Sequence, residues 1–325
     1  MLDYLRNRLR SLKLTYTVYN FLHQRKLRHN EQLYRRYGLR KRVYQSVSSE
    51  DFKALGAGEP PRFDAHDSRL AAASYPEFKQ FSPAVQEGIL SWSERGYMVL
   101  RGFFTPEEVA TINSEIERLI GQGDANWRYN HVKIMFAIHQ SEAIRRIVAK
   151  PELHAVLSFL LGKPVTQPFQ SINFIQGSQQ RAHSDTIHMT TYPLGYMVAA
   201  WIALENIDAS NGPVFYYPGS HRLPYVLNND YPHGNTHFTI GESAYKAYEN
   251  AIDAVVHQNQ LQPEEFHAQA GDVLLWHANL LHGGTPIRDA NRTRKSMVLH
   301  YFADDVICYH EITQRPALRE QAQNA

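Results

Sequence analysis

The sequence predicts a mostly β protein with flanking helices, in which an antiparallel sandwich or barrel follows a helical, basic N-terminal region. After Val165 the chain changes to short apolar runs separated by Gly, Pro and Asn, a texture typical of such β folds. Before that point, helix signals dominate. The third observation is an uneven charge distribution, which the small net charge of +2 conceals.

Bulk composition places the chain among globular proteins. Hydrophobic residues make up 43% and charged residues 20% of the 325 residues, which excludes disordered and fibrous classes and allows one large β domain with an N-terminal piece. The single cysteine, Cys308, cannot form an intramolecular disulfide and indicates a reducing compartment. No stretch approaches the ~18 apolar residues of a membrane span, and no signal peptide is recognised, so we expect a cytoplasmic protein.

The first 45 residues are strongly basic. They hold 12 Lys and Arg against Asp3 and Glu31, a net +10, and apolar residues recur there at steps of three and four. This pattern predicts an amphipathic helix with an apolar stripe of Leu2, Leu5, Leu9, Leu12, Tyr16 and Tyr19. Two interpretations stay open: peripheral attachment to an anionic membrane, or packing against the main domain or a second subunit. Nucleic acid is not expected, because no recognition motif accompanies the charge.

The domain boundary is predicted by a Gly- and Pro-containing segment, Leu55–Pro61, which is typical of a linker. It follows a second basic stretch at residues 25–42. We therefore expect residues 1–60 to form a basic helical region with its linker, and residues 61–325 to form the main domain.

The main domain opens with a strand over residues 97–104 and a helix to about residue 120. Thr105 can cap this helix, Pro106 suits its first position, and Glu108 completes a capping box. Further helices are predicted at 142–149 and 151–161, with a helical insertion at 245–256. The predicted strands cover residues 171–175, 197–204, 214–217, 273–276 and 295–302.

Three residues form a candidate metal site. His183 and Asp185 lie two apart, so on a strand both side chains would point to one face. His282 follows a buried apolar run and supplies a second imidazole. Two His and one carboxylate make the facial triad of non-haem iron(II) oxygenases, which leaves positions open for a 2-oxo acid and O2. A surface pair or a hydrogen-bonded structural His is the alternative for the His-X-Asp spacing.

A basic residue downstream supports the oxygenase interpretation. 2-Oxoglutarate needs a cation for its distal carboxylate, and Arg294 stands at the start of an apolar strand, 12 residues after His282. Arg288 and Arg292 are rivals, but Arg292 falls in the preceding turn. A solvated charge cluster fits both rivals well.

The combined motifs resemble the phytanoyl-CoA dioxygenase family over roughly residues 96–302. The matching stretches are His183–Asp185, Trp201–Asn206, Asn211–His221, Asp272–Gly283, Arg294–Ser296 and the opening Gly96–Glu108. This resemblance implies a double-stranded β-helix (a cupin-like jelly roll) with Fe(II) held by His183, Asp185 and His282. It also implies 2-oxoglutarate on Arg294, O2 as oxidant, and release of succinate and CO2.

Finer details follow from the same resemblance. Asn173 is the candidate for a supporting 2-oxoglutarate contact. Some members carry a hydroxyl residue two positions after the distal His, where this chain has Gly284, so Thr285 becomes the candidate for that contact. Asp185 favours hydroxylation over halogenation, because halogenating relatives replace this carboxylate with a small residue. The residues after Asp185 depart from those of ectoine hydroxylases.

The remaining candidates have weaker roles. His188 and His277 are not expected to bind the metal, and His221 and His300 are expected to stabilise the fold by hydrogen bonds. Tyr216 and Tyr217 are candidate substrate contacts, and the substrate itself is expected to be a small molecule or a lipid- or saccharide-linked compound. Two other functions remain open: a zinc hydrolase using the same His2Asp set, and a non-catalytic jelly-roll binding protein.

Overall fold

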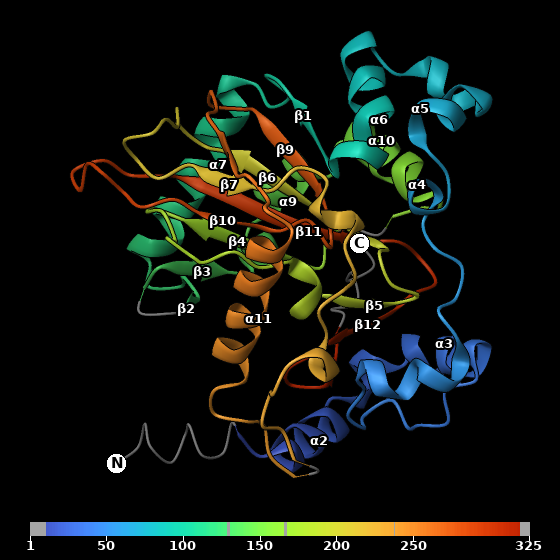
Figure 1. Ribbon diagram of the computed structural model, residues 1–325. Helices are drawn as coiled ribbons and strands as arrows, with labels where there is room; N and C mark the ends of the chain where they lie inside the picture. Colours follow the sequence, from blue (N-terminus) through green and yellow to red (C-terminus); the bar gives the residue numbers. More distant parts are fainter. Residues whose placement is uncertain (1–10, 129–130, 166–167, 237, 319–325) are drawn as a thin grey trace.

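The computed structural model describes residues 11–128, 131–165, 168–236 and 238–318 (Figure 1). Its centre is a seven-stranded antiparallel sheet in the order β1-β9-β6-β11-β4-β3-β2, accompanied by two three-stranded sheets, β10-β7-β8 and β13-β12-β5. The strands are β1 Tyr97–Leu100, β2 Trp127–Arg128, β3 Lys133–Met135, β4 Gln170–Phe174, β5 Thr190–Tyr192, β6 Met197–Ala203, β7 Val214–Tyr216, β8 Glu264–Phe266, β9 Val273–His277, β10 His282–Gly284, β11 Ser296–Phe302, β12 Ile307–His310 and β13 Arg315–Pro316.

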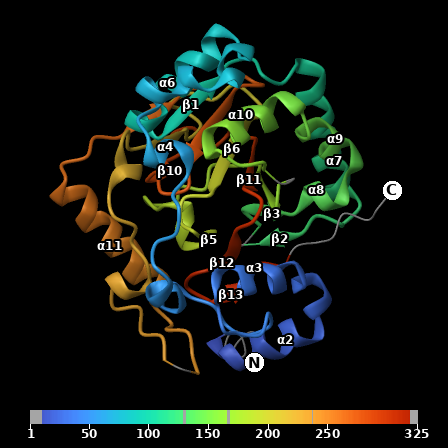
Figure 2. The ribbon, with the colours of Figure 1, turned by 90° about the vertical axis from the view of Figure 1, so that its right-hand side faces the viewer.

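Helices surround these sheets, and Figure 2 shows α7–α9 on one side of the molecule and α11 on the other. The helices are α2 Lys13–Leu22, α3 His29–Tyr37, α4 Arg62–Ala65, α5 Ser68–Ala71, α6 Pro83–Arg95, α7 Pro106–Gly121, α8 Ala137–Gln140, α9 Glu142–Val148, α10 Pro151–Leu161 and α11 Ala244–Gln258. The architecture is therefore a mixed helix-and-sheet fold with antiparallel sheets, with more helix than the predicted mostly β fold. Residues 62–95, which the sequence patterns left unassigned, account for α4, α5 and α6.

The two faces of the large sheet have different surroundings. Strands β6 and β11 are buried along their whole length, because side chains cover them from both sides. On β11, odd-numbered residues face the helices; for example, the Tyr301 hydroxyl donates to the Val148 carbonyl in α9. Even-numbered residues, among them Ser296 and His300, face the opposite way. We call this second side the inner face.

The helix predicted to begin after Thr105 is confirmed as α7, together with its capping box. The Thr105 hydroxyl accepts from the Glu108 amide, and the Glu108 carboxylate accepts from the Thr105 amide at 2.8 Å. Helices α9, α10 and α11 and strands β4, β6, β7, β9 and β11 lie where the patterns predicted them. The small strand β10 was not predicted, because His282-Gly-Gly carries no strand pattern.

The basic N-terminal region packs through its apolar residues onto the β13-β12-β5 sheet. Leu27, Val47 and Phe52 form a buried cluster with Tyr192 and Tyr309. Figure 2 shows α2 and α3 at this end of the molecule, next to β12 and β13. Leu2, Leu5 and Leu9 of the predicted stripe lie outside the described residues. Within the described ranges, no helix combines the length and apolar character that a bilayer span requires.

Candidate metal centre

The two candidate His ligands are direct cross-strand partners. His183 and His282 form an isolated antiparallel bridge in which each backbone N–H donates to the other residue's carbonyl at 2.9 Å. Side chains of residues opposite one another in such a pair project to the same side. The imidazole centroids consequently lie 4.4 Å apart, although 99 positions separate the residues in the sequence.

Asp185 joins this pair from a turn rather than from a strand. The prediction that His183 and Asp185 share a strand was wrong, because η5 (Asp185–Ile187), a 3-10 turn, begins at Asp185. The convergence nevertheless holds. His282 Nε2 lies 3.7 Å from Asp185 Oδ1, and one ligand atom from each of the three side chains lies within 4.8 Å of the others. All three residues are buried.

Hydrogen bonds orient both imidazoles toward one point. Nδ1 of His183 lies 2.9 Å from the Arg181 carbonyl, and Nδ1 of His282 lies 3.0 Å from the Leu280 carbonyl. Carbonyls only accept, so each Nδ1 carries the proton and each Nε2 keeps a lone pair for a metal. Burial, reinforced by the neighbouring His282, holds the pKa of His183 well below its ordinary value, and the opposing charge of Asp185 does not cancel this. The neutral imidazole is the form that binds metals.

The carboxylate of Asp185 is held by one hydrogen bond and has a second aromatic side chain close to the same oxygen. The Trp276 indole Nε1 donates to Oδ2 at 2.7 Å, and His300 Nε2 lies 3.6 Å from the same oxygen. Burial alone would raise the pKa of Asp185, but His282 and His300 hold it well below its ordinary range. His300, predicted to stabilise the fold by hydrogen bonding, thus acts on the candidate ligand itself. The carboxylate stays charged, as metal binding requires.

Removing the indole donor is expected to weaken iron binding. In Trp276→Phe the Asp185 carboxylate loses its 2.7 Å hydrogen bond, and loss of such an outer contact typically costs about 10- to 100-fold in metal affinity. Competition with a chelator of known Fe(II) affinity measures this change. Trp92→Phe alters an equally buried indole in α6, away from the centre, and should leave the affinity unchanged. Equal affinities for both variants would show that the indole does not support the ligand.

Arg294 is a buried cation without a carboxylate partner. It is 2% exposed, its guanidinium donates to the Ser296 hydroxyl at 2.6 Å, and its Nε has no hydrogen-bond partner. No ion pair joins it to any carboxylate among the described residues. Burial lowers its pKa to about 10, so the group stays charged at neutral pH. The rival Arg292 is partly exposed, with 35% of its side chain accessible, and is paired with Asp208 at 2.7 Å.

A second cation, which sequence reasoning missed, lies on the same face. Lys133 of β3 pairs across the sheet with Phe174, which in turn pairs with Ser296, so these side chains share the inner face with Arg294. Burial lowers the pKa of Lys133, Asp185 opposes the shift, and Arg294 adds to it. The only sequence signal for this position is the alternation of Lys133, Ile134 and Met135, and three residues are too few to predict a strand.

Of the two predicted 2-oxoglutarate contacts, Asn173 is directed away from Arg294 and the Thr285 hydroxyl is already hydrogen-bonded. Asn173 pairs with Met297, so its side chain points to the opposite face of the sheet, and both of its polar atoms are buried without partners. The Thr285 hydroxyl donates to the Pro213 carbonyl at 3.0 Å. At Gly284 an added Cβ would meet Ser178 and the Gln179 backbone at 3.1 Å, so a hydroxyl side chain there would need its neighbours to move.

Four other histidines are not part of the ligand set, although the ring of His188 packs edge-on against that of His183 with centroids 6.4 Å apart. His277 Nε2 lies 3.1 Å from Asp64, and its ring neighbours His221. His188 contacts His310 at 3.4 Å. None of these four His belongs to the set of converging ligand atoms in the described residues. Tyr216, a candidate substrate contact, instead packs on Tyr97 with ring centroids 4.3 Å apart. Tyr217 packs edge-on against Phe215.

Helix α11 lies against the loop that carries the ligands. The Tyr248 hydroxyl accepts from the Ser184 amide at 2.9 Å, between the two ligands of that loop. Gln180 links three elements, because its amide donates to the Tyr245 hydroxyl at 2.7 Å and its oxygen accepts from Lys133 at 3.0 Å. The same amide nitrogen lies 3.3 Å from His183 Nε2. The insertion between β7 and β8 therefore forms one wall of the centre.

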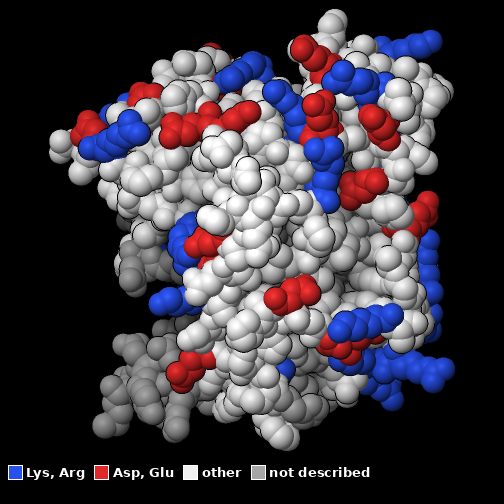
Figure 3. Space-filling view, viewed as in Figure 1, with Lys and Arg blue, Asp and Glu red and all other residues white. Residues whose placement is uncertain are grey.

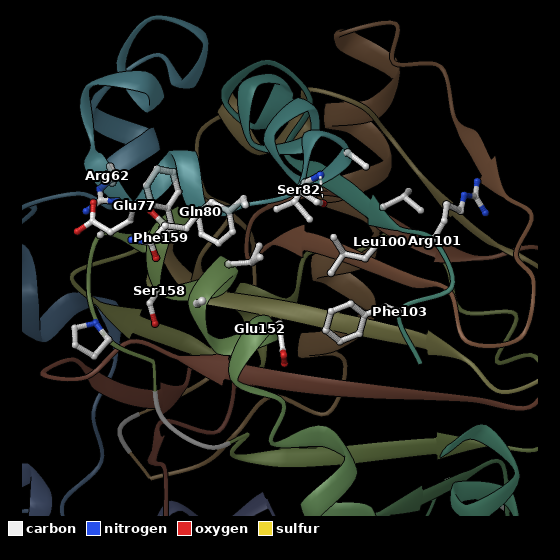
Figure 4. Close-up of a pocket in the computed structure, with 18 of the residues that line it drawn as sticks. Arg62, Glu77, Gln80, Ser82, Leu100, Arg101, Phe103, Glu152, Ser158 and Phe159 are labelled. Carbon is white, nitrogen blue, oxygen red and sulfur yellow. Dashed lines mark hydrogen bonds between the residues drawn. The ribbon is translucent and has the colours of Figure 1, made fainter. Parts of the chain in front are cut away.

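A groove of about 960 Å³ lies elsewhere on the molecule. Figure 4 shows it between α6 and α10 beside β1, with Arg62, Leu100 and Phe159 in its lining. The lining does not include the three candidate ligands, so this groove is separate from the metal centre.

Comparison with known proteins gives a consistent result. Residues 92–296 match the phytanoyl-CoA dioxygenase (PhyH) family. The ectoine dioxygenase of Sphingopyxis alaskensis is 26% identical over 243 residues, which cover 69% of this chain and 79% of that protein. The peroxisomal phytanoyl-CoA dioxygenase of Rattus norvegicus is 23% identical over 271 residues, covering 70% and 72%.

Solved structures share the fold. The non-haem carbocyclase SnoK from nogalamycin biosynthesis superposes with a TM-score of 0.59 at 16% identity, over 76% of this chain and 96% of that one. The S. alaskensis ectoine dioxygenase superposes with a TM-score of 0.55 at 22% identity, over 72% and 83%. The antiparallel sheets are thus of the jelly-roll type of these enzymes. This chain belongs to the phytanoyl-CoA dioxygenase family, and it is a dioxygenase that depends on Fe(II), 2-oxoglutarate and O2.

Proposed function

We propose that His183, Asp185 and His282 bind the iron and that Arg294 binds the distal carboxylate of 2-oxoglutarate. The observation that carries the second assignment is the buried guanidinium with no carboxylate partner among the described residues. A buried charge is costly unless an opposite charge compensates it, and the planar fork of Arg suits a carboxylate. Lys133 adds positive charge on the same face. The donor set fits Fe(II), since two imidazoles and one carboxylate leave three positions open.

The proposed reaction is hydroxylation of a substrate C–H bond. The bound iron supplies the oxidising chemistry: one oxygen atom of O2 enters the substrate and the other enters succinate, while 2-oxoglutarate loses CO2. The protein's part is to hold the reactants. Nδ1 hydrogen bonds fix both imidazoles, Trp276 fixes the carboxylate, and burial excludes water from the centre. The retained carboxylate at Asp185 supports hydroxylation rather than halogenation.

The proposed substrate is a small molecule or a lipid- or saccharide-linked compound. Relatives named for ectoine and for phytanoyl-CoA support this breadth, since one name denotes a small polar solute and the other an acyl thioester. Residues 61–325 are the proposed catalytic domain, with residues 1–60 attached to it. We place the protein in the cytoplasm on the strength of its single, buried Cys308, with the basic N-terminal region touching an anionic membrane peripherally.

The reaction class is tested by the cosubstrates that turnover consumes. With Fe(II), ascorbate and 2-oxoglutarate in air, slow formation of succinate is expected even without the substrate, and it should stop under argon or when Zn(II) replaces iron. Metabolite extracts that accelerate succinate formation then lead to the substrate. Hydrolysis of a substrate by the zinc form without O2 would favour a metallohydrolase, and no succinate under any condition would favour a binding protein.

A further inference from the structure

Helix α2 presents its apolar side to solvent. Leu14, Val18, Phe21 and Leu22 are 69%, 51%, 49% and 72% exposed. Their spacing of four, seven and eight residues from Leu14 aligns them in one stripe along the helix, which we call the α2 stripe. Large exposed apolar residues are unremarkable when scattered, but a contiguous set marks a contact surface.

The two residues that α2 buries against the protein are polar, and the half-buried Tyr16 beside them carries the Arg315 guanidinium over its ring. Lys13 is 9% exposed and Asn20 is 2% exposed, and the Asn20 amide donates to the Tyr44 carbonyl. A surface helix of a water-soluble domain normally shows the reverse orientation, with its apolar stripe in the core. Helix α2 is therefore amphipathic in the opposite sense, and its exposed stripe fits an apolar partner outside the domain.

The charge around the stripe indicates the nature of that partner. Arg25 and Arg28, just after α2, are exposed, and neither forms an ion pair with another described residue. Figure 3 shows uncharged atoms at the end of the molecule where α2 lies, with Lys and Arg gathered beside them over α3. The first 45 residues carry a net +10. A second copy docked on α2 would bring two such regions together and repel, whereas anionic lipid headgroups would attract them.

We propose that the α2 stripe inserts into the interface of an anionic bilayer, with the exposed cations Arg25 and Arg28 lying on the lipid headgroups. An in-plane amphipathic helix binds lipid in this way, through buried apolar area together with charge. The inference rests on the peripheral attachment put forward under Proposed function and names the residues that make it. It does not depend on the iron chemistry.

The docking surface is joined to the wall of the metal centre. Leu12, next to α2, forms a β-bridge with Thr239, and the Ile240 amide donates to the Ser11 carbonyl at 2.7 Å. Residues 239–243 lead directly into α11, whose Tyr248 holds the ligand loop at Ser184. Figure 1 shows the segment between the start of α11 and α2. A bilayer bound to α2 would therefore lie next to the α11 insertion, which forms one wall of the metal centre.

Vesicle sedimentation of the full-length protein tests the proposal. Vesicles of phosphatidylcholine with phosphatidylglycerol should bind the protein, vesicles of phosphatidylcholine alone should bind it at least about tenfold less, and added salt should weaken binding. The triple variant Leu14→Ser, Val18→Ser, Leu22→Ser should lower binding to anionic vesicles at least about tenfold. Leu70→Ser is the matched control, because Leu70 of α5 is 82% exposed and lies outside the stripe.

Three outcomes would overturn the proposal. They are no binding to anionic vesicles, equal binding of the triple variant and wild type, or a concentration-dependent dimer that the triple variant abolishes without any vesicle binding. The last result would identify a second copy as the partner. Thermal unfolding checks that the variants fold. The iron-dependent absorption of the holoenzyme is measured in parallel, so that a failure of lipid docking is separated from a failure of the oxygenase assignment.

Discussion

Replacing His282 by alanine is expected to remove iron binding and 2-oxoglutarate turnover together. The residue supplies one of three converging ligand atoms and lies 3.7 Å from the Asp185 carboxylate. Its loss leaves one imidazole and one carboxylate, too few to retain Fe(II) at micromolar concentration. We expect succinate formation to fall by more than the ~100-fold that loss of an outer contact typically costs. Metal analysis after gel filtration and a succinate assay measure the two effects.

The control for this variant is His267→Ala. His267 is exposed, paired with Glu265, and not among the converging ligand atoms, so iron content and turnover should match the wild type. Thermal unfolding of the metal-free proteins shows whether His282→Ala keeps its fold, since the backbone bridge to His183 does not need the imidazole. A folded His282→Ala protein that retains one iron per chain would remove His282 from the ligand set.

The second large effect is expected at Arg294. In Arg294→Met the cosubstrate loses its buried cation, and loss of one partner of a buried charge pair costs about 2–4 kcal/mol, or about 30- to 1000-fold in 2-oxoglutarate affinity. The thermal stability of the metal-free protein is expected to change in the opposite direction. Because Arg294 is buried without a carboxylate partner, an apolar side chain of similar length should leave its melting temperature unchanged or raise it.

Two further variants make the Arg294 experiment specific. Arg292→Met removes a partly exposed guanidinium that is paired with Asp208, and its 2-oxoglutarate affinity should equal that of the wild type. Arg294→Lys keeps the charge but not the planar fork, so an intermediate affinity is expected. Isothermal titration of the iron-loaded proteins under anaerobic conditions gives the affinities. An unchanged affinity in Arg294→Met would reassign the carboxylate to another cation, with Lys133 the first candidate.

What the sequence could predict is local or carried by a strong pattern. The capping box at Thr105 and Glu108 gave the start of α7, because both hydrogen bonds form within four residues. The residues His183, Asp185 and His282 could be singled out as a candidate metal-binding set from the His-X-Asp spacing, the downstream Arg294 and the family resemblance together. The expected strand at Asp185 was wrong because a 3-10 turn begins there, yet the convergence survived, since the backbone pairing of His183 with His282 sets the position of the turn.

What the sequence could not give depends on pairing between distant strands. Asn173 stands in a correctly predicted strand, but its face is set by the register against Met297, which no local pattern reveals. The register of β3 against β4 likewise places Lys133 on the same face as Arg294, although β3 has only three residues. In the sequence, Trp276 could be recognised only as an apolar strand residue. Its hydrogen bond to Asp185 depends on how the fold places β9 against the ligand loop.

The most direct test of the whole account is an anaerobic titration of the metal-free protein with Fe(II) and then 2-oxoglutarate. We expect a visible metal-to-ligand charge-transfer band that saturates at one iron per chain. The band should be absent in His183→Ala and His282→Ala, and in Arg294→Met it should appear only at a much higher 2-oxoglutarate concentration. No band in the wild type, or a band of full strength in either histidine variant, would contradict the account.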